Sequence, residues 1–227
     1  MTRPTSAMLF AAGFGTRMGA LTQVQPKPMI EVAGLPLIDH ALGPIRTAGI
    51  ANIVANLHYR PERLRPYLEE RGVVTITEAP DILETGGGLR NALPELGPDP
   101  VLTMNSDAVW HGPNPVEALC AAWDPGRMDA LLLLVPQARA HGHRGAGSFA
   151  LDADGRISEH PDLIYTGVQI IRTDGLAAIE ASAFSIWEIW RPMIAAGRMF
   201  GHVYDGHWCD VGHPDGIAVA EAMLALS

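Results

Sequence analysis

Residues 9–28, LFAAGFGTRMGALTQVQPKP, constrain this chain more than any other stretch. An apolar strand, expected at residues 7–11, runs directly into a turn that contains Gly13 and Gly15. A glycine-rich turn after a strand places backbone N–H groups where they can bind a polyanion. Arg17 adds a planar guanidinium and Lys27 adds a point charge. The stretch therefore predicts a binding site for a triphosphate at the end of the first strand, and a plain tight turn is the alternative.

Neither of the common nucleotide-binding motifs is present at this turn. The turn lacks the Gly-Lys-Ser/Thr sequence of the phosphate loop of ATPases. It also lacks a third glycine at the position that the dinucleotide fingerprint requires, which argues against a hydride-transfer site.

The run LFAAGFGTRM, with the later PKP, resembles the signature of sugar-1-phosphate nucleotidyltransferases, also called NDP-sugar pyrophosphorylases. Further motifs follow in the order that this family shows, so the resemblance covers nearly the whole chain. They are LETGGG at residues 83–88, NSD at 105–107, YTG at 165–167 and WCDVG at 208–212. The LETGGG version is most similar to the branch of uridylyltransferases that act on N-acetylmuramate 1-phosphate. A branch of guanylyltransferases for mannose or heptose 1-phosphate is also similar.

The resemblance implies an enzyme that joins a nucleoside triphosphate, UTP by preference, to a sugar 1-phosphate and releases pyrophosphate, with Mg²⁺ as cofactor. For the branch named above, the implied pathway is the recycling of cell-wall sugars. A cytidylyltransferase for a phosphoalcohol is a more distant alternative. An alternative from another class is a catalytically silent sensor of nucleotides or sugar phosphates. A sensor could lose some of the charged residues that the family uses, and four of them are present at the matching positions: Arg17, Lys27, Asp107 and Asp210.

Strand and helix patterns alternate along the chain, which predicts an α/β fold with a mostly parallel sheet flanked by helices. The resemblance implies the Rossmann-like, GT-A-like version of that fold. We expect one domain over residues 1–227, with residues 137–164 as a small inserted β-rich lobe and no C-terminal β-helix. The helical stripe at residues 37–48 contains Pro44, which is expected to kink or interrupt it. The three glycines at 86–88 are expected to form a turn before a short helix at 89–93.

Two aspartates are the candidate ligands for the metal. Asp107 follows the apolar strand expected at residues 101–104, at the carboxyl end where α/β sheets bind their ligands. Mg²⁺ prefers one or two carboxylates together with phosphate oxygens. A turn or helix-capping role is the alternative for Asp107 and for Asp210. The resemblance implies that both hold the metal.

The resemblance also implies the other contacts. Arg17 would hold the β- and γ-phosphates, and Lys27 would balance charge at the reacting centre. The nucleotide would contact the first turn and the 84–88 segment, through Ala11, Ala12, Gly13, Gly15, Thr16, Glu84 and Gly87. The sugar phosphate would contact Lys27, Asn105, Gly145, Glu159, Thr166 and Gly167. His160 departs from the family pattern, which has a phosphate-binding lysine there.

Composition restricts the possible partners. The formal net charge of −9 argues against nucleic-acid binding, which needs a basic surface, and Lys27 is the only lysine in the chain. No apolar run approaches the ~20 residues of a membrane helix. Cys120 and Cys209 are too few for a disulfide framework, which favours a reduced, cytoplasmic setting, and no secretion signal is visible. Monomer and homodimer both remain open.

Overall fold

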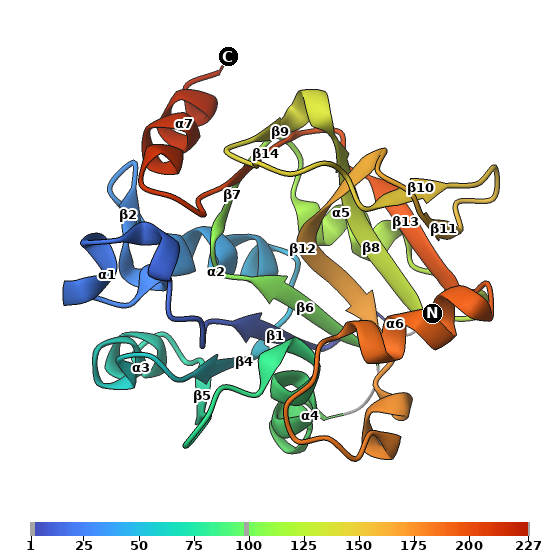
Figure 1. The fold of residues 1–227 in the computed structure, drawn as a ribbon, viewed down its shortest axis with the longest axis horizontal. Coiled ribbons are helices and arrows are strands. Elements are labelled where there is room, and N and C mark those ends of the chain that lie inside the picture. The colour runs from blue at the N-terminus through green and yellow to red at the C-terminus, as the bar shows by residue number, and fades with distance from the viewer. Residues whose placement is uncertain (1–2, 98–99, 227) are drawn as a thin grey trace.

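The computed structural model describes residues 3–97 and 100–226. A nine-stranded sheet forms the centre of the molecule, and helices cover both of its faces (Figure 1). Along the sheet the strands lie in the order β5-β4-β1-β6-β12-β8-β13, and the β10–β11 hairpin pairs with the first residue of β12. The bounds are β1 Ser6–Phe10, β4 Asn52–Leu57, β5 Val74–Thr77, β6 Val101–Asn105, β8 Ala130–Pro136, β10 Phe149–Leu151, β11 Ile157–Glu159, β12 Leu163–Ile171 and β13 Met199–Val203.

The parallel half of the sheet positions the first turn. Strand β1 lies between β4 and β6 and runs parallel to both, and β4 runs parallel to β5. Because β1 is covered on both faces, its residues form a continuous apolar run rather than an alternating one. The carboxyl ends of β1 and β6 therefore meet at one edge, where the glycine-rich turn and residue Asp107 begin.

The other half of the central sheet is connected to the parallel half through an antiparallel strand, β12. Strand β12 runs antiparallel to β6 on one side and to β8 on the other, and β8 runs parallel to β13. The pairing of β12 with β8 is irregular between Tyr165 and Gln169, where a β-bulge lies. The predicted mostly parallel α/β fold is confirmed, with β12 as the strand that reverses direction.

Alternate side chains of the strands pack into two separate cores. Ala7 and Leu9 point to the face covered by α2, α3 and α5, whereas Met8 points to the face covered by α4 and α6. The helices are α2 Leu37–Thr47, α3 Pro61–Glu69, α4 Glu84–Leu96, α5 Pro115–Ala122 and α6 Trp187–Ala195. Shorter pieces connect these elements: η1 Thr16–Met18, α1 Leu21–Val24, η2 Lys27–Met29, the β2–β3 hairpin (Glu31–Val32, Leu35–Pro36), η3 Gln137–Arg139 and η4 Asp174–Ala178.

A second, three-stranded sheet lies beside the carboxyl end of β6 (Figure 1). In it, β14 (His207–Asp210) lies between β7 (Ala108–His111) and β9 (Ala140–His141), and α7 (Asp215–Leu224) packs against it. Asp210 is opposite Ala108 in the β14–β7 ladder, and the backbone N–H of Val211 donates to the carbonyl of Asp107 at 2.9 Å. This small sheet thus brings Asp210 next to Asp107.

Two local features differ from expectation. Helix α2 runs through Pro44 without interruption, so of the two effects expected of this proline the interruption does not occur. The three glycines do not form a turn before a helix, because α4 begins at Glu84 and contains them. They allow close packing: a Cβ at Gly86 would lie 2.5 Å from the Phe184 ring, and one at Gly87 would lie 2.5 Å from the carbonyl oxygen of Ser182.

The short strands expected within residues 137–164 are present, but they do not form a sheet of their own. Strands β10 and β11 join the central sheet, and β9 joins the small sheet. This segment is therefore shared between the two sheets of the molecule.

The packing of α4 makes a prediction about helix glycines. Gly86→Ala should lower the free energy of unfolding by ~1–3 kcal/mol, because the new methyl group would overlap the ring of Phe184. Gly43→Ala in α2 is the matched control: nothing lies within 4 Å of its Cβ position, so stability should rise by up to ~1 kcal/mol. Urea unfolding of both variants measures the difference, and equal stabilities would contradict this account of the glycine run.

Candidate active site

Two adjoining cavities lie at the carboxyl ends of β1 and β6. The first has a volume of about 350 Å³ and the second about 220 Å³. Both are lined by Phe10, Gly13, Ile82 and Asp107. The first is also lined by Ala11, Phe14, Gly15, Thr16, Arg17, Lys27, Pro28, Ser106 and Gly212, and the second by Ala12, Asn56, Glu84, Thr85 and Asn105.

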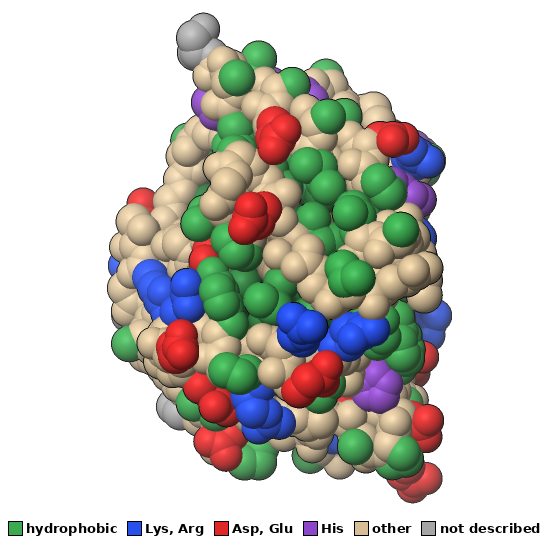
Figure 2. Space-filling model, turned by 90° about the vertical axis from the view of Figure 1, so that its left-hand side faces the viewer, with side chains coloured by type: hydrophobic (Ala, Val, Ile, Leu, Met, Phe, Trp, Pro, Cys, Tyr) green, Lys and Arg blue, Asp and Glu red, His purple; other side chains and the backbone are tan. Residues whose placement is uncertain are grey.

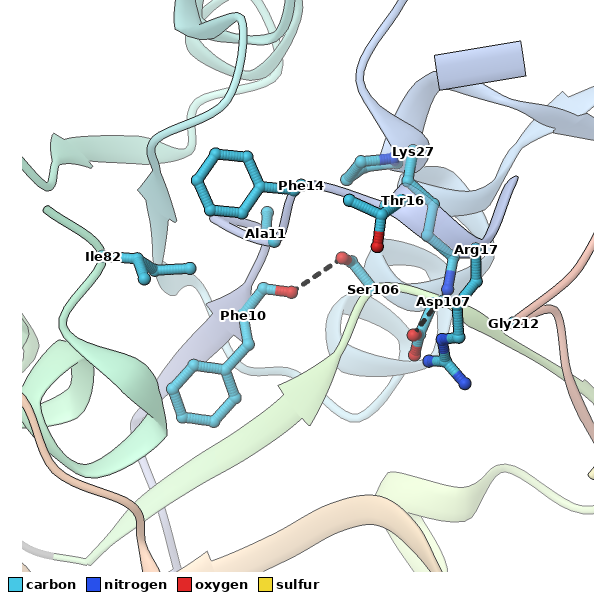
Figure 3. A pocket seen from close by; sticks show the side chains of 13 residues that line it. Phe10, Ala11, Phe14, Thr16, Arg17, Lys27, Ile82, Ser106, Asp107 and Gly212 are labelled. Atoms are coloured by element: carbon cyan, nitrogen blue, oxygen red, sulfur yellow. Dashed lines mark hydrogen bonds and ion pairs between the residues drawn. The ribbon is translucent and has the colours of Figure 1, made fainter. Parts of the chain in front are cut away.

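The first cavity has a charged side and an apolar side. Arg17, Lys27 and Asp107 lie together on one side, and Phe14 and Ile82 lie on the other (Figure 3). The charged side fits the anionic part of a ligand. Ile82 on the apolar side also lines the second cavity, so one elongated ligand could extend across both cavities. Most of the predicted nucleotide-binding residues line one of the two cavities: Ala11, Ala12, Gly13, Gly15, Thr16, Arg17 and Glu84.

The conformation of the glycine-rich turn depends on Gly15. Its φ is +64°, a value that favours glycine, and a Cβ there would lie 2.9 Å from Cβ of Lys27 and from Cγ2 of Thr22. The Thr22 hydroxyl donates to the Gly15 carbonyl at 3.1 Å, which closes the turn. Gly15 therefore lets the turn wrap closely against the segment that carries Lys27.

Lys27 and Asp107 form the central ion pair of the site. Nζ of Lys27 donates to Oδ2 of Asp107 at 2.8 Å, and the lysine residue is only 8% exposed (Figure 3). Burial of the ammonium group is costly unless a charge partner is present, and Asp107 supplies that charge. The pair joins η2, which follows the glycine-rich turn, to the end of β6.

Arg17 and Asp210 complete the charged group. A Cβ at Gly212 would lie 3.1 Å from Oδ1 of Asp210 and 3.3 Å from Nη1 of Arg17, so both side chains lie against this glycine. Burial raises the pKa of Asp210, and the nearby Asp107 carboxylate raises it further, against the opposing effects of Lys27, Arg17 and His143. Two cations and two carboxylates therefore converge beside the first cavity.

These carboxylates suit a magnesium ion that is shared with a substrate. Within residues 3–97 and 100–226, no group of three or more His, Cys, Asp or Glu side chains could hold a metal ion by itself, so further ligands would have to come from a substrate or water. Mg²⁺ commonly takes one or two carboxylates and completes its shell with phosphate oxygens and water. The raised pKa of Asp210 reflects burial together with two negative charges in proximity, which a divalent cation would offset.

The second cavity is backed by a network that the sequence patterns do not reveal. The backbone N–H of Ala11 donates to Oδ1 of Asn56 at 2.9 Å, and Nδ2 of Asn56 donates to Oε1 of Glu78 at 2.7 Å. Both Asn56 and Glu78 are buried. The one sequence signal is their position near the ends of apolar strands, where a buried polar residue needs a partner. Glu84, at the start of α4, has a φ of +60°, which is strained for a residue other than glycine.

The predicted sugar-binding residues are less closely grouped. Asn105 lines the second cavity, and Gly167 lies behind it, since a Cβ at Gly167 would be 2.6 Å from Nδ2 of Asn105. The Thr166 side chain is buried, and its hydroxyl donates to the Leu133 carbonyl rather than toward a cavity. Gly145 and Glu159, also predicted to bind the sugar phosphate, are exposed and line neither cavity. Gly87, predicted to bind the nucleotide, is buried in α4 and lines neither cavity either. Their contacts with ligands stay predictions.

Two residues of the motifs have structural roles here. Ser106 occupies the middle position of NSD, and its hydroxyl donates to the Phe10 carbonyl at 2.7 Å, which ties β6 to β1 (Figure 3). Cys209 is fully buried, and burial raises the pKa of its thiol to about 12, so it is not a nucleophile.

Comparison with known proteins identifies the relatives of this chain. A family model described as "MobA-like NTP transferase domain" matches residues 7–205. N-acetylmuramate alpha-1-phosphate uridylyltransferase of Caulobacter vibrioides is 38% identical, over 98% of both chains. The enzyme of the same name from Neisseria meningitidis serogroup B is 32% identical, over 96% of this chain and 97% of the relative. A mannose-1-phosphate guanyltransferase of Hypocrea jecorina is 30% identical, over 91% of this chain but 60% of the relative.

A solved structure agrees with the fold. UDP-glucose pyrophosphorylase complexed with UDP-glucose superposes with a TM-score of 0.79, at 16% identity, over 98% of both chains. Together with the family match over most of the sequence and the two relatives that align along nearly its full length, this places the chain in the family of MobA-like NTP transferase domains, among the sugar-1-phosphate nucleotidyltransferases.

Proposed function

We propose that this protein transfers a uridylyl group from UTP to N-acetylmuramate 1-phosphate, giving UDP-N-acetylmuramate and pyrophosphate in the recycling of cell-wall sugars. The observation that carries the proposal is the full-length similarity to two uridylyltransferases of this specificity, at 38% and 32% identity. The grouping of Arg17, Lys27, Asp107 and Asp210 at the glycine-rich turn supports the reaction type.

The reaction needs positioning and charge stabilisation more than a protein nucleophile. A phosphate oxygen of the sugar 1-phosphate attacks the α-phosphorus of UTP, a new P–O bond forms there, and the bond to the β-phosphate oxygen breaks to release pyrophosphate. Both reactants are anions, so their approach is opposed by charge repulsion. The ammonium of Lys27 and the guanidinium of Arg17 offset that repulsion, and the N–H groups of the glycine-rich turn can bind the phosphates.

Magnesium is part of this proposal. Asp107 and Asp210 would hold the ion, which when bound neutralises phosphate charge and draws electrons from the phosphoryl group. Lys27, already paired with Oδ2 of Asp107, would keep that carboxylate oriented toward the cavity.

The second candidate is a guanylyltransferase for mannose 1-phosphate, which the similarity to the fungal enzymes favours. The same charged residues would serve that reaction, so the base and the sugar are what separate the two. The chain spans only about 60% of the length of those fungal relatives, whereas it matches the uridylyltransferases end to end.

The remaining expectations concern partners and compartment. Basic side chains on the face shown in Figure 2 form only small groups interspersed with acidic ones, which suits phosphorylated small molecules better than nucleic acid. No helix among the described residues is both long and apolar enough to cross a bilayer. Both cysteines are free thiols, which fits a reducing compartment such as the cytoplasm.

A panel of substrates tests the proposal. Pyrophosphate release should be fastest with UTP and N-acetylmuramate 1-phosphate when UTP, GTP, CTP, ATP and dTTP are each offered with several sugar 1-phosphates and Mg²⁺. Release with GTP and mannose 1-phosphate instead would move the chain to the second candidate. Nucleotide binding without release across the panel would favour the sensor alternative or a substrate outside the panel, such as a phosphoalcohol.

Lys27→Ala should reduce kcat about 100-fold or more, because the variant loses a cation that stabilises charge in the transition state. Circular dichroism and thermal unfolding should show that the variant folds. Arg191→Ala is the control, since Arg191 only forms an exposed ion pair with Glu188 and should keep the normal rate. A folded Lys27→Ala enzyme with a near-normal rate would remove Lys27 from the reaction.

Asp210→Asn tests the second carboxylate. The substitution keeps the shape of the side chain but removes one charge, so the Mg²⁺ concentration for half-maximal rate should rise about tenfold or more. Asp215→Asn, which changes an exposed carboxylate paired with Arg144, is the matched control and should leave the requirement unchanged. An identical Mg²⁺ dependence in the Asp210 variant would show that this residue is not a ligand.

A further inference from the structure

The two walls of the second cavity are joined by one buried chain of hydrogen bonds. The Ala11 N–H donates to Oδ1 of Asn56 at 2.9 Å, and Nδ2 of Asn56 donates to Oε1 of Glu78 at 2.7 Å. The other carboxyl oxygen of Glu78, Oε2, accepts from the backbone N–H of Leu83 at 2.7 Å. Ala11 begins the glycine-rich turn, and Leu83 precedes Glu84 at the start of α4. The chain of bonds therefore sets how far apart these two segments lie.

The direction of each bond in this network is determined by chemistry. The carboxylate of Glu78 only accepts, so it faces the NH₂ group of Asn56 on one side and a backbone N–H on the other. The Asn56 amide must then present its oxygen to the Ala11 N–H. Asn56 thus works as a relay, with a donor at one end and an acceptor at the other. If Asn56 were a carboxylate or Glu78 an amide, two acceptors or two donors would face each other in this network.

The network is also held rigidly by its surroundings. Asn56 is 3% exposed and Glu78 is 2% exposed. The backbone N–H of Glu78 donates to the Leu57 carbonyl at 2.8 Å, which ties Glu78 to the end of β4. Gly88 of α4 makes room for it, because a Cβ there would lie 2.7 Å from Oε1 of Glu78 and 2.9 Å from Nδ2 of Asn56. A buried network with every member paired has a unique geometry.

We infer that the second cavity receives the nucleotide base, and that Asn56 and Glu78 are positioning residues that set its width and, through it, the affinity for the nucleotide and the discrimination between bases. Asn56 lines the second cavity beside Ala12 and Glu84, two of the residues predicted to contact the nucleotide. Glu84, whose φ is positive, directly follows Leu83 in the chain. The hydrogen bond from the Leu83 N–H to Glu78 therefore anchors a strained stretch of backbone that forms one wall of the second cavity. This inference rests on the proposed nucleotidyl transfer.

Reversal of the relay provides the test. In Asn56→Asp alone, a carboxylate faces Oε1 of Glu78, so two acceptors meet. In Glu78→Gln alone, the new amide oxygen can still accept from Asn56, but the new NH₂ then faces the Leu83 N–H, so two donors meet. In the double variant Asn56→Asp/Glu78→Gln, the new carboxylate at position 56 accepts from the Ala11 N–H and from the new amide NH₂ at position 78. The carbonyl oxygen of that new amide accepts from the Leu83 N–H. Every bond is then restored with the charge moved to the other residue.

Steady-state kinetics with each nucleoside triphosphate distinguish a positioning role of Asn56 and Glu78 from a role in stability alone. Each single variant should raise KM for the preferred triphosphate about tenfold and narrow the ratio of kcat/KM between it and the other triphosphates. The double variant should restore KM and the ratio. Gly88→Ala would push a methyl group against the Asn56–Glu78 hydrogen bond without removing either polar side chain. It should change KM and base discrimination as the single variants do, and it replaces them in the test if they do not fold.

Leu119→Ala in α5 is the control for lost stability, because Leu119 is buried but lines neither cavity. It should lower Tm and keep both KM and base discrimination. Variants of the relay that lower Tm yet keep normal KM and discrimination would overturn the inference and leave a structural role only, as would a double variant that is not rescued. Failure of the proposed function is a separate result, since the unsubstituted protein would then release no pyrophosphate with any triphosphate.

Discussion

The candidate active site depends on one ion pair, between the buried Lys27 and the partly exposed Asp107. Lys27 can be buried because Asp107 balances its charge, and the two side chains join the segment after the glycine-rich turn to the end of β6. The pair is made possible by the parallel arrangement of β1 and β6, whose carboxyl ends lie at the same edge of the sheet. A sheet with another strand order would separate the two groups. The chemistry of the site and the topology of the fold are therefore linked at this contact.

Three parts of the fold contribute residues to the candidate site: the central sheet, the small sheet and the start of α4. The central sheet supplies the turn and Asp107, and the small sheet supplies Asp210 through β14. The buried relay of Asn56 and Glu78 links the turn to the start of α4 on the other side. The regions proposed to bind the phosphates and the base thus have separate supports, which meet at the same turn.

The sequence predicts those parts of the structure that depend on local patterns. The strand at 101–104 and the turn with its cations follow from apolar runs and glycine spacing, and the place of Asp107 at the edge of the sheet follows from that strand. The relay could not be predicted, because Asn56 and Glu78 acquire their partners only through tertiary contacts. The glycines at 86–88 were misjudged for a related reason: their function is to admit Phe184, Ser182 and Glu78, which are remote or unmarked in the sequence.

The position of β14 has a consequence for the synthesis of the protein. It is the last strand of the described chain, so the ribosome adds Asp210 long after the glycine-rich turn, Lys27 and Asp107. A chain that ends before β14 contains the glycine-rich turn, Lys27 and Asp107, but it lacks the second carboxylate. The four-residue charged group is therefore complete only when β14 has been made and the small sheet closes against β7.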